Sequence, residues 1–201
     1  MRAPILARLA HSKRRLAFAS VFTCVAALSG SAHAEDAAAC KALADAMIAN
    51  LKTPYHSYAT ITFGYAPTVD EARRKMHLPL AQDSETIFTG QAAFFRLQPR
   101  KWQPLPGSLT QFQDSVRESV TGLTNCAHLP DDTVNGEKTS VYVGSSKPQN
   151  HSVQTKVWVS PKGVPARTET DIEIGDTPGG EIHQHISTRY EYGAIQAPPL
   201  D

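Results

Sequence analysis

Hydrophobic residues recur every three or four positions in two segments of the chain, which predicts two amphipathic helices. The first prediction covers Glu35–Leu51 and ends before Pro54. Its apolar stripe consists of Cys40, Leu43, Met47 and Leu51. The second helix begins after Ser108, a favourable N-cap, and ends near Gly122. Its stripe consists of Leu109, Phe112, Val116 and Val120.

Elsewhere the hydrophobic period is two, which predicts strands with one buried face. The predicted strands are a segment from Ser57, then Glu85–Thr89, Gln91–Leu97, Leu123–Leu129, Lys138–Val143, Ser152–Ser160, Pro165–Ile174 and Glu181–Tyr192. Pro130-Asp131-Asp132 is interpreted as a turn. Asn135-Gly136 is a strong two-residue turn signal, but the sequence leaves open which pair of strands it joins. The helices interrupt the strand order rather than alternating with strands. The pattern therefore favours an α+β fold with an antiparallel sheet.

The segment Gly64–Ser84 loses both periods and carries a charged patch between two prolines. A 21-residue excursion of this kind is long for a compact domain, and such loops often act as lids or binding loops. A surface excursion without a function is the equal alternative.

The first 34 residues have the three parts of a secretory signal peptide. Met1–Arg15 is basic, Leu16–Leu28 is apolar, and Ala32-His33-Ala34 matches a cleavage site. The apolar run has 13 residues, whereas about 20 are needed to span a bilayer, so an uncleaved anchor is the weaker alternative. We expect cleavage after Ala34 and a single domain over residues 35–201. Arg14-Arg15 leaves the choice between the general and the twin-arginine export route open.

Removal of the leader changes the charge of the chain. The whole sequence has 20 basic and 19 acidic residues, and residues 1–34 hold five of the basic ones and no acidic one. The mature chain thus has 15 basic and 19 acidic residues, a net charge of −4. A mildly acidic surface gives no reason to expect a nucleic-acid partner, and we expect no stable membrane insertion after cleavage.

Two cysteines remain after cleavage, Cys40 and Cys126, and an even pair in an exported chain predicts a disulfide. Lipid modification of Cys40 is an alternative, but the leucine usual three residues before a lipidated cysteine is missing. A redox-active pair is a further alternative, although nothing resembles Cys-x-x-Cys.

Chemistry-bearing residues form no recognisable catalytic arrangement. His183 and His185 share one face of the last strand and could supply two metal ligands, but zinc sites need three or four. Glu169, Asp171 and Glu173 alternate along one strand, as on a solvated face. The sequence has no nucleophile elbow and no phosphate-binding glycine loop. We therefore predict a protein that is not an enzyme, with no catalytic residues, metal or cofactor.

Each predicted strand has one apolar face, and two helices are too few to cover seven or eight strands. A curved sheet would leave an apolar cavity, which is a natural site for a lipid, an acyl chain or another hydrophobic molecule. The predicted ligand-binding residues are Ile61, Phe63, Phe95, Leu97, Val157, Val159, Ile182 and Ile186.

The segment Trp158–Arg167 leads from a tryptophan strand through a turn to Gly-apolar-Pro-x-basic. With Trp102 and the closing Tyr190–Gly193, it resembles the periplasmic lipoprotein-carrier (LolA-like) superfamily. That resemblance implies a strongly curved half-barrel with the two main helices on its concave side. It also implies a periplasmic location and a hydrophobic ligand in the cavity.

Two functions remain open from the sequence. The leading one is a non-enzymatic periplasmic protein that binds a hydrophobic ligand. The alternative is a module with a packed core and no ligand, which binds a protein partner through Gly64–Ser84.

Overall fold

The computed structural model describes residues 36–65, 70–71, 74, 80–147, 151–175 and 182–200. These residues form nine strands and two long helices. The helices are α1 (Ala37–Asn50) and α3 (Leu109–Thr121). The strands are β1 (Tyr55–Tyr65), β2 (Ala81–Phe88), β3 (Ala93–Leu97), β4 (Gln103–Pro104), β5 (Thr124–Val134), β6 (Glu137–Ser146), β7 (His151–Val159), β8 (Pro165–Ile174) and β9 (Ile182–Tyr192).

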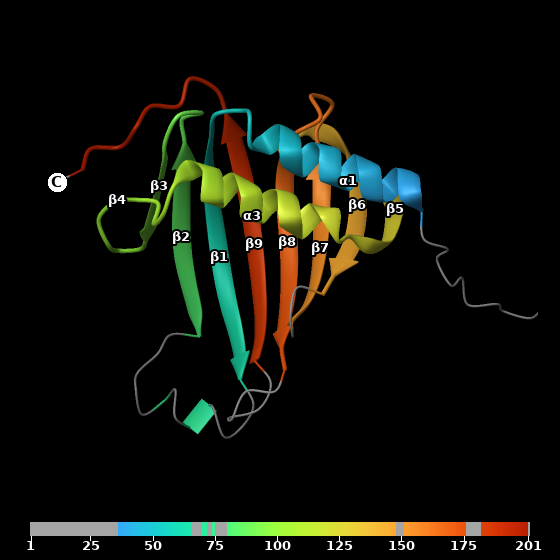
Figure 1. Ribbon diagram of the computed structural model, residues 1–201, viewed down its shortest axis with the longest axis horizontal. Coiled ribbons are helices and arrows are strands. Elements are labelled where there is room, and N and C mark those ends of the chain that lie inside the picture. Colours follow the sequence, from blue (N-terminus) through green and yellow to red (C-terminus); the bar gives the residue numbers. More distant parts are fainter. Residues whose placement is uncertain are drawn as a thin grey trace, which may run out of the picture. The chain divides into compact units, whose positions relative to one another are not determined.

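All nine strands belong to one antiparallel sheet, in the order β4-β3-β2-β1-β9-β8-β7-β6-β5. The first and last long strands are therefore neighbours in the middle, and β1 pairs with β9 from Tyr55↔Tyr192 to Tyr65↔Ile182. On one side of this pair the chain runs outward from β1 to β4. On the other side β5 to β9 form a meander that returns to the centre (Figure 1).

The two helices lie side by side across one end of one face of the sheet (Figure 1). The Asp36 side chain caps α1 by accepting from the backbone N–H of Ala38 and Ala39. Ser108 and Gln111 form a reciprocal capping box at the start of α3. These caps satisfy backbone donors that a helix terminus leaves unpaired.

The buried side of α1 consists of Ala39, Leu43, Ala46 and Asn50, a face slightly rotated from the predicted stripe. Small side chains on this face let the helix approach the sheet closely. Gly144 on β6 contributes to the same fit, because a Cβ there would lie 3.1 Å from Cys126 Sγ and 3.3 Å from a Leu43 methyl group. A disulfide joins Cys40 of α1 to Cys126 of β5 at this contact.

One predicted turn needs correction. Pro130-Asp131-Asp132 is not a turn: β5 continues to Val134, with a register shift against β6 between Leu129 and Asp132. Proline lacks a backbone N–H. Because β5 is an edge strand, the outer side of the strand needs no N–H for a neighbouring strand, so Pro130 is tolerated there. The hairpin turn is Asn135-Gly136, whose φ angles of 53° and 84° suit asparagine and glycine.

The predicted excursion Gly64–Ser84 is also shorter than expected. Gly64 belongs to β1, and Ala81–Ser84 begins β2, where Ala59 pairs with Ser84. Most of the intervening segment, and residues 1–35 with the expected leader and cleavage site, lie outside the described residues. A partner site at 64–84 therefore stays a prediction.

The predicted fold class is confirmed: an α+β fold in which a curved, open antiparallel sheet carries two helices. In the described part of the chain, no helix combines the length and the apolarity needed to cross a bilayer.

We predict that the Cys40–Cys126 disulfide stabilises the fold substantially, because it joins residues 86 positions apart. The Cys40→Ala/Cys126→Ala double variant should lose about 4–5 kcal/mol of unfolding free energy relative to the oxidised protein in urea titrations. Alkylation followed by mass spectrometry under non-reducing conditions provides the control. Modification of both cysteines in the folded protein would contradict the prediction.

Candidate functional site

The sheet has two chemically different faces, and the helix face is defined by the residues that α1 and α3 cover. Tyr55 lies on this face, where it packs with Phe88 and Leu109 of α3. Strand alternation places Ile61 and Phe63 on the same face. The pairing of Ile61 with Ile186 extends this assignment to β9.

All eight predicted ligand-binding residues lie on the helix face. Residues that pair directly on neighbouring strands point to the same face of a sheet. Phe95 pairs with Thr86, Leu97 with Ser84 and Val157 with Thr168, and these three partners lie on the helix face. Ile182 precedes Ile186 by four positions on β9, and Val159 follows Val157 by two on β7. The predicted sidedness of the strands is therefore correct for every residue in the set.

The eight residues differ in burial and in the hollows that they border. Val157 is fully buried in the core, at 0% exposure, whereas the other seven are partly buried. Val159 lines a hollow of about 350 Å³ beside Tyr142 and Pro161. Phe95 and Leu97 border a hollow of about 40 Å³ near Arg100.

The remaining four predicted residues form one continuous patch together with two isoleucines that the sequence analysis missed. Phe63 and Ile172 both pair with Gln184, and Ile174 pairs with Ile182. We call this patch the apolar strip: Ile61, Phe63, Ile172, Ile174, Ile182 and Ile186. Alternation with acidic residues in the β8 segment Thr170–Ile174 was the signal that could have identified the two extra isoleucines.

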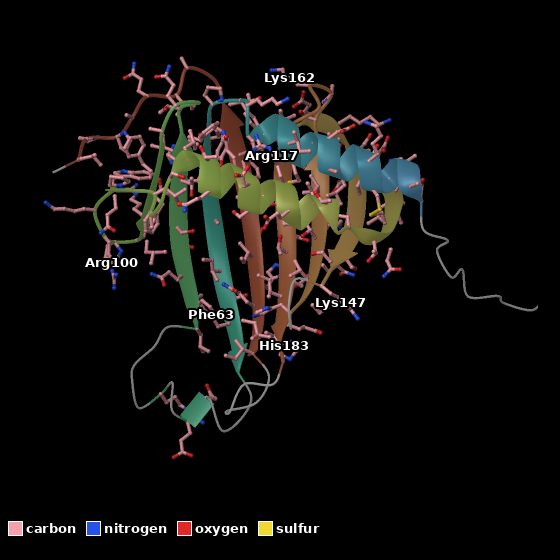
Figure 2. The ribbon with its side chains drawn as sticks, in the orientation of Figure 1. Phe63, Arg100, Arg117, Lys147, Lys162 and His183 are labelled. Carbon is pink, nitrogen blue, oxygen red and sulfur yellow. A yellow bond between two sulfur atoms is a disulfide. The ribbon has the colours of Figure 1, made fainter. Side chains whose placement is uncertain are left out.

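The apolar strip lies at the end of the sheet away from the helices. Figure 2 shows Phe63 near the far end of β1, well separated from α1 and α3. Every member of the strip is partly buried. The helix-covered end of the same face, by contrast, contains fully buried residues such as Leu43 and Phe88.

An aromatic cluster lies at the helix-covered end of the same face. The ring of Tyr55 lies 5.5 Å from those of both Phe88 and Tyr190. The Tyr192 hydroxyl donates to the carbonyl oxygen of Pro165 (2.7 Å) and lies 2.9 Å from Oδ1 of Asn50 at the end of α1. Burial raises the pKa of Tyr55, Tyr190 and Tyr192, so these residues are neutral parts of the core.

Helix α3 presents its apolar stripe toward this cluster without burying it completely. Leu109 packs against Tyr55 and Phe88, which fixes the side of α3 that faces the sheet. Phe112 and Val116 share that side by helical spacing and remain partly buried, whereas Val120 is buried. Apolar surface is thus incompletely covered on α3 as well as on the sheet.

The opposite face, which we call the polar face, carries a row of large polar side chains across six strands. Cross-strand pairing aligns Trp158, Arg167, Arg189, Tyr58, Glu85 and Arg96. The Arg189 guanidinium lies 3.8 Å from the centre of the Tyr58 ring, and that of Arg167 lies 4.8 Å from the Trp158 ring. Such contacts are cation–π interactions between ordered side chains.

Glu85 is the most buried ionisable residue of this row, with 4% exposure. Its carboxylate accepts hydrogen bonds from Arg96 (2.7 and 3.1 Å), from Nε2 of His56 (2.9 Å) and from the Gln98 amide. Burial alone would raise the pKa of Glu85, but these hydrogen bonds outweigh it and hold the pKa below its usual value of 4.5. Trp102 contacts the same group of side chains, because the Arg96 guanidinium lies 4.7 Å from the centre of its ring.

The histidines singled out in the sequence also lie on the polar face. Nδ1 of His185 lies 2.7 Å from Asp171, and Nδ1 of His183 lies 3.9 Å from Glu173. These two pairs border a hollow of about 450 Å³. Within the described ranges, no three His, Cys, Asp or Glu side chains are grouped so that they could hold a metal ion. Glu169, Asp171 and Glu173 share this solvated face, as expected.

Comparison with known proteins gives fold likenesses at low identity. No family model matches the chain, and no curated protein sequence matches it significantly. Among solved structures, the lipoprotein LppX from Mycobacterium tuberculosis is 14% identical over 83% of this chain and 100% of its own, with a TM-score of 0.43. LprF from Mycobacterium bovis is 11% identical over 82% and 97%, with a TM-score of 0.44.

A lipoprotein-sorting domain is a further solved neighbour. This outer-membrane lipoprotein-sorting protein domain from Vibrio parahaemolyticus is 10% identical over 80% of this chain and 95% of its own, with a TM-score of 0.22. With TM-scores below 0.5, these likenesses carry no argument about what this chain binds.

We predict that Glu85 makes folding stability depend on pH in the acid range. Because its folded-state pKa lies below 4.5, the carboxylate stabilises the fold above that pH, and this contribution is lost as the pH falls through the folded-state pKa. The Glu85→Gln variant should therefore lose about 1–3 kcal/mol of unfolding free energy at pH 7.

Urea unfolding from pH 7 to pH 3 measures this dependence. The difference in unfolding free energy between the native protein and the Glu85→Gln variant should narrow as the pH falls below 4.5. Glu118→Gln on the exposed side of α3 is the matched control and should leave the pH dependence of the unfolding free energy unchanged. A gap of constant size at all pH values would contradict the prediction.

Proposed function

We propose that this protein is exported to the periplasm and there binds a hydrophobic ligand, a lipid or acyl chain, without catalysing a reaction. The observation that carries the proposal is the apolar strip on the helix face. Its six residues adjoin one another across β1, β9 and β8, yet none of them is fully buried.

Incomplete coverage of the strip is energetically significant. Apolar surface that remains in contact with water favours any partner that removes it. Each methylene group transferred from water contributes about 0.8 kcal/mol, so a ten-carbon acyl segment would gain about 8 kcal/mol before the cost of immobilisation. That balance is compatible with reversible binding, as a carrier requires.

The partly buried stripe of α3 adds apolar surface at the helix-covered end of the same face. Phe112 and Val116 lie on the side of the helix that faces the sheet, as Leu109 establishes. An acyl chain that runs along this face from the strip toward α3 would contact apolar side chains of both. The proposed site thus keeps Ile61, Phe63, Ile182 and Ile186 from the original prediction and adds Ile172 and Ile174.

The sequence supports the location. The charged, apolar and small-residue parts of residues 1–34 are those of a cleavable leader, and we propose cleavage after Ala34 to give the domain 35–201. The Cys40–Cys126 disulfide agrees with an oxidising compartment such as the periplasm.

Polar substitutions in the strip should weaken binding of a fatty-acyl probe. We expect the Ile61→Ser/Ile186→Ser variant to bind cis-parinaric acid at least tenfold more weakly than the native protein, because two neighbouring apolar contacts are lost. Fluorescence titration measures the affinity. Val143→Thr, a substitution of a partly buried residue on the polar face, is the matched control and should retain native affinity.

The native protein also tests the competing function. A partner-binding module with a packed core would take up no acyl probe and would release no lipid on organic extraction. If the native protein neither binds cis-parinaric acid nor yields lipid by mass spectrometry, the proposed function is wrong. Equal affinity of the Ile61→Ser/Ile186→Ser variant would exclude the strip as the site.

A further inference from the structure

The largest hollow among those described lies on the polar face, separate from the proposed acyl site, and has a volume of about 570 Å³. Side chains of β1, β2, β8 and β9 form its floor, and the tip of the β5–β6 hairpin forms a wall. The register shift between Leu129 and Asp132 bends this hairpin, and Asp132 then accepts a hydrogen bond from the Trp158 indole N–H (2.9 Å). The hollow is therefore shaped by ordered contacts.

Two arginines lie directly opposite each other in the floor. Arg167 of β8 pairs with Arg189 of β9, and both side chains line the hollow. Like charges directly opposite on neighbouring strands are destabilising, with Cβ atoms about 4.5–5.5 Å apart. An anionic group between the two guanidinium groups would remove this repulsion.

Both arginines keep donors for such a group. Arg167 donates to Glu169, and Arg189 donates to Glu191, in each case through one terminal nitrogen to a neighbour on its own strand. A guanidinium has five N–H donors, and its fork matches the two oxygens of a carboxylate. Among the described residues, Glu169 and Glu191 are the acceptors of this pair, so most of its donors can serve a ligand in the hollow.

Aromatic rings hold these arginines in place. Arg189 lies over Tyr58, and Arg167 lies over Trp158, whose 3% exposure shows how completely it is enclosed. Lys156 covers the same indole, with its ammonium 4.4 Å from the ring centre. Ordered donors lose little conformational entropy when a ligand binds, which is the advantage of a preorganised site.

The rim of the hollow has the opposite chemistry. Asp83 and Asp132 are hydrogen-bond acceptors, and Ser187 and Asn135 add neutral polar groups. The indole N–H of Trp158 and the backbone N–H of Thr133 lower the pKa of Asp132, so it remains a carboxylate. Hydroxyl groups can donate to these carboxylates, whereas a second negative charge on a ligand would be repelled.

We propose that this hollow binds a polyhydroxylated monoacid, such as an acidic sugar. The ligand carboxylate lies between Arg167 and Arg189, and the ligand hydroxyls donate to Asp83 and Asp132. A volume of about 570 Å³ is within the range of small-molecule sites and accommodates one or two sugar rings.

Isothermal titration calorimetry with D-glucuronate, D-glucose and inorganic phosphate tests the proposal on the native protein. We expect D-glucuronate to bind at least tenfold more tightly than either of the other probes. Glucose lacks the carboxylate, and phosphate lacks the hydroxyls and carries more negative charge near pH 7. If D-glucose bound as tightly as D-glucuronate, the carboxylate, and with it the arginine pair, would not determine binding. If phosphate bound more tightly than D-glucuronate, the ligand hydroxyls would not contribute to recognition.

Variants locate the binding. Arg189→Met and Arg167→Lys should each weaken D-glucuronate binding at least tenfold, the latter because lysine keeps the charge but loses the planar fork. Arg117→Met on α3, which removes an exposed arginine paired with Asp114, is the matched control (Figure 2). Circular dichroism and thermal unfolding verify that each variant is folded.

Failure of this proposal and failure of the proposed function are distinguishable. No heat of binding with any of the three probes, or unchanged D-glucuronate affinity in folded Arg189→Met, would overturn the sugar-acid site. The uptake of cis-parinaric acid would be unaffected by either result, because the strip lies on the other face of the sheet.

Discussion

The pairing of β1 with β9 is the constraint on which the rest of the structure depends. It joins two strands more than a hundred residues apart along their full length, and its register determines what each face displays. On one face it places Ile61 beside Ile186, and Tyr55 opposite Tyr192. On the other it places Tyr58 opposite Arg189. A slip of one residue would exchange the two faces, so the apolar strip and the arginine pair both depend on this register.

Local chemistry determined how much of this could be predicted from the sequence. Ser108, Gly122 and Asn135-Gly136 act through their own backbone geometry, so the second helix and the turn at Asn135-Gly136 were correctly predicted. Which strands the turn joins was not, because the extent of β5 was misjudged. Pro130-Asp131-Asp132 was misinterpreted because a proline on an edge strand leaves no local sign that the strand continues. The eight apolar residues were assigned to the correct face, since alternation is local. Their division between separate hollows depends on strand order, which the pattern does not contain.

The polar face was the part that the sequence concealed most. Arg167, Arg189, Tyr58 and Glu85 are distributed over more than one hundred residues, and each is unremarkable in its own strand. Only the pairing of β8 with β9 and of β9 with β1 brings them into one row. The same sheet can therefore offer an apolar surface on one side and a network of ordered charges on the other. Occupation of the two faces would be independent, because no side chain belongs to both.

The irregular β5 strand has a consequence for association between molecules. An outer strand with a straight, unpaired backbone edge can pair with another chain and start aggregation. In β5 this edge is interrupted by two register shifts, by Pro130 and by the adjacent carboxylates of Asp131 and Asp132. An incoming strand would meet a missing donor, a bend and negative charge within three residues. The bend that forms one wall of the hollow thus also hinders edge-to-edge polymerisation of the protein.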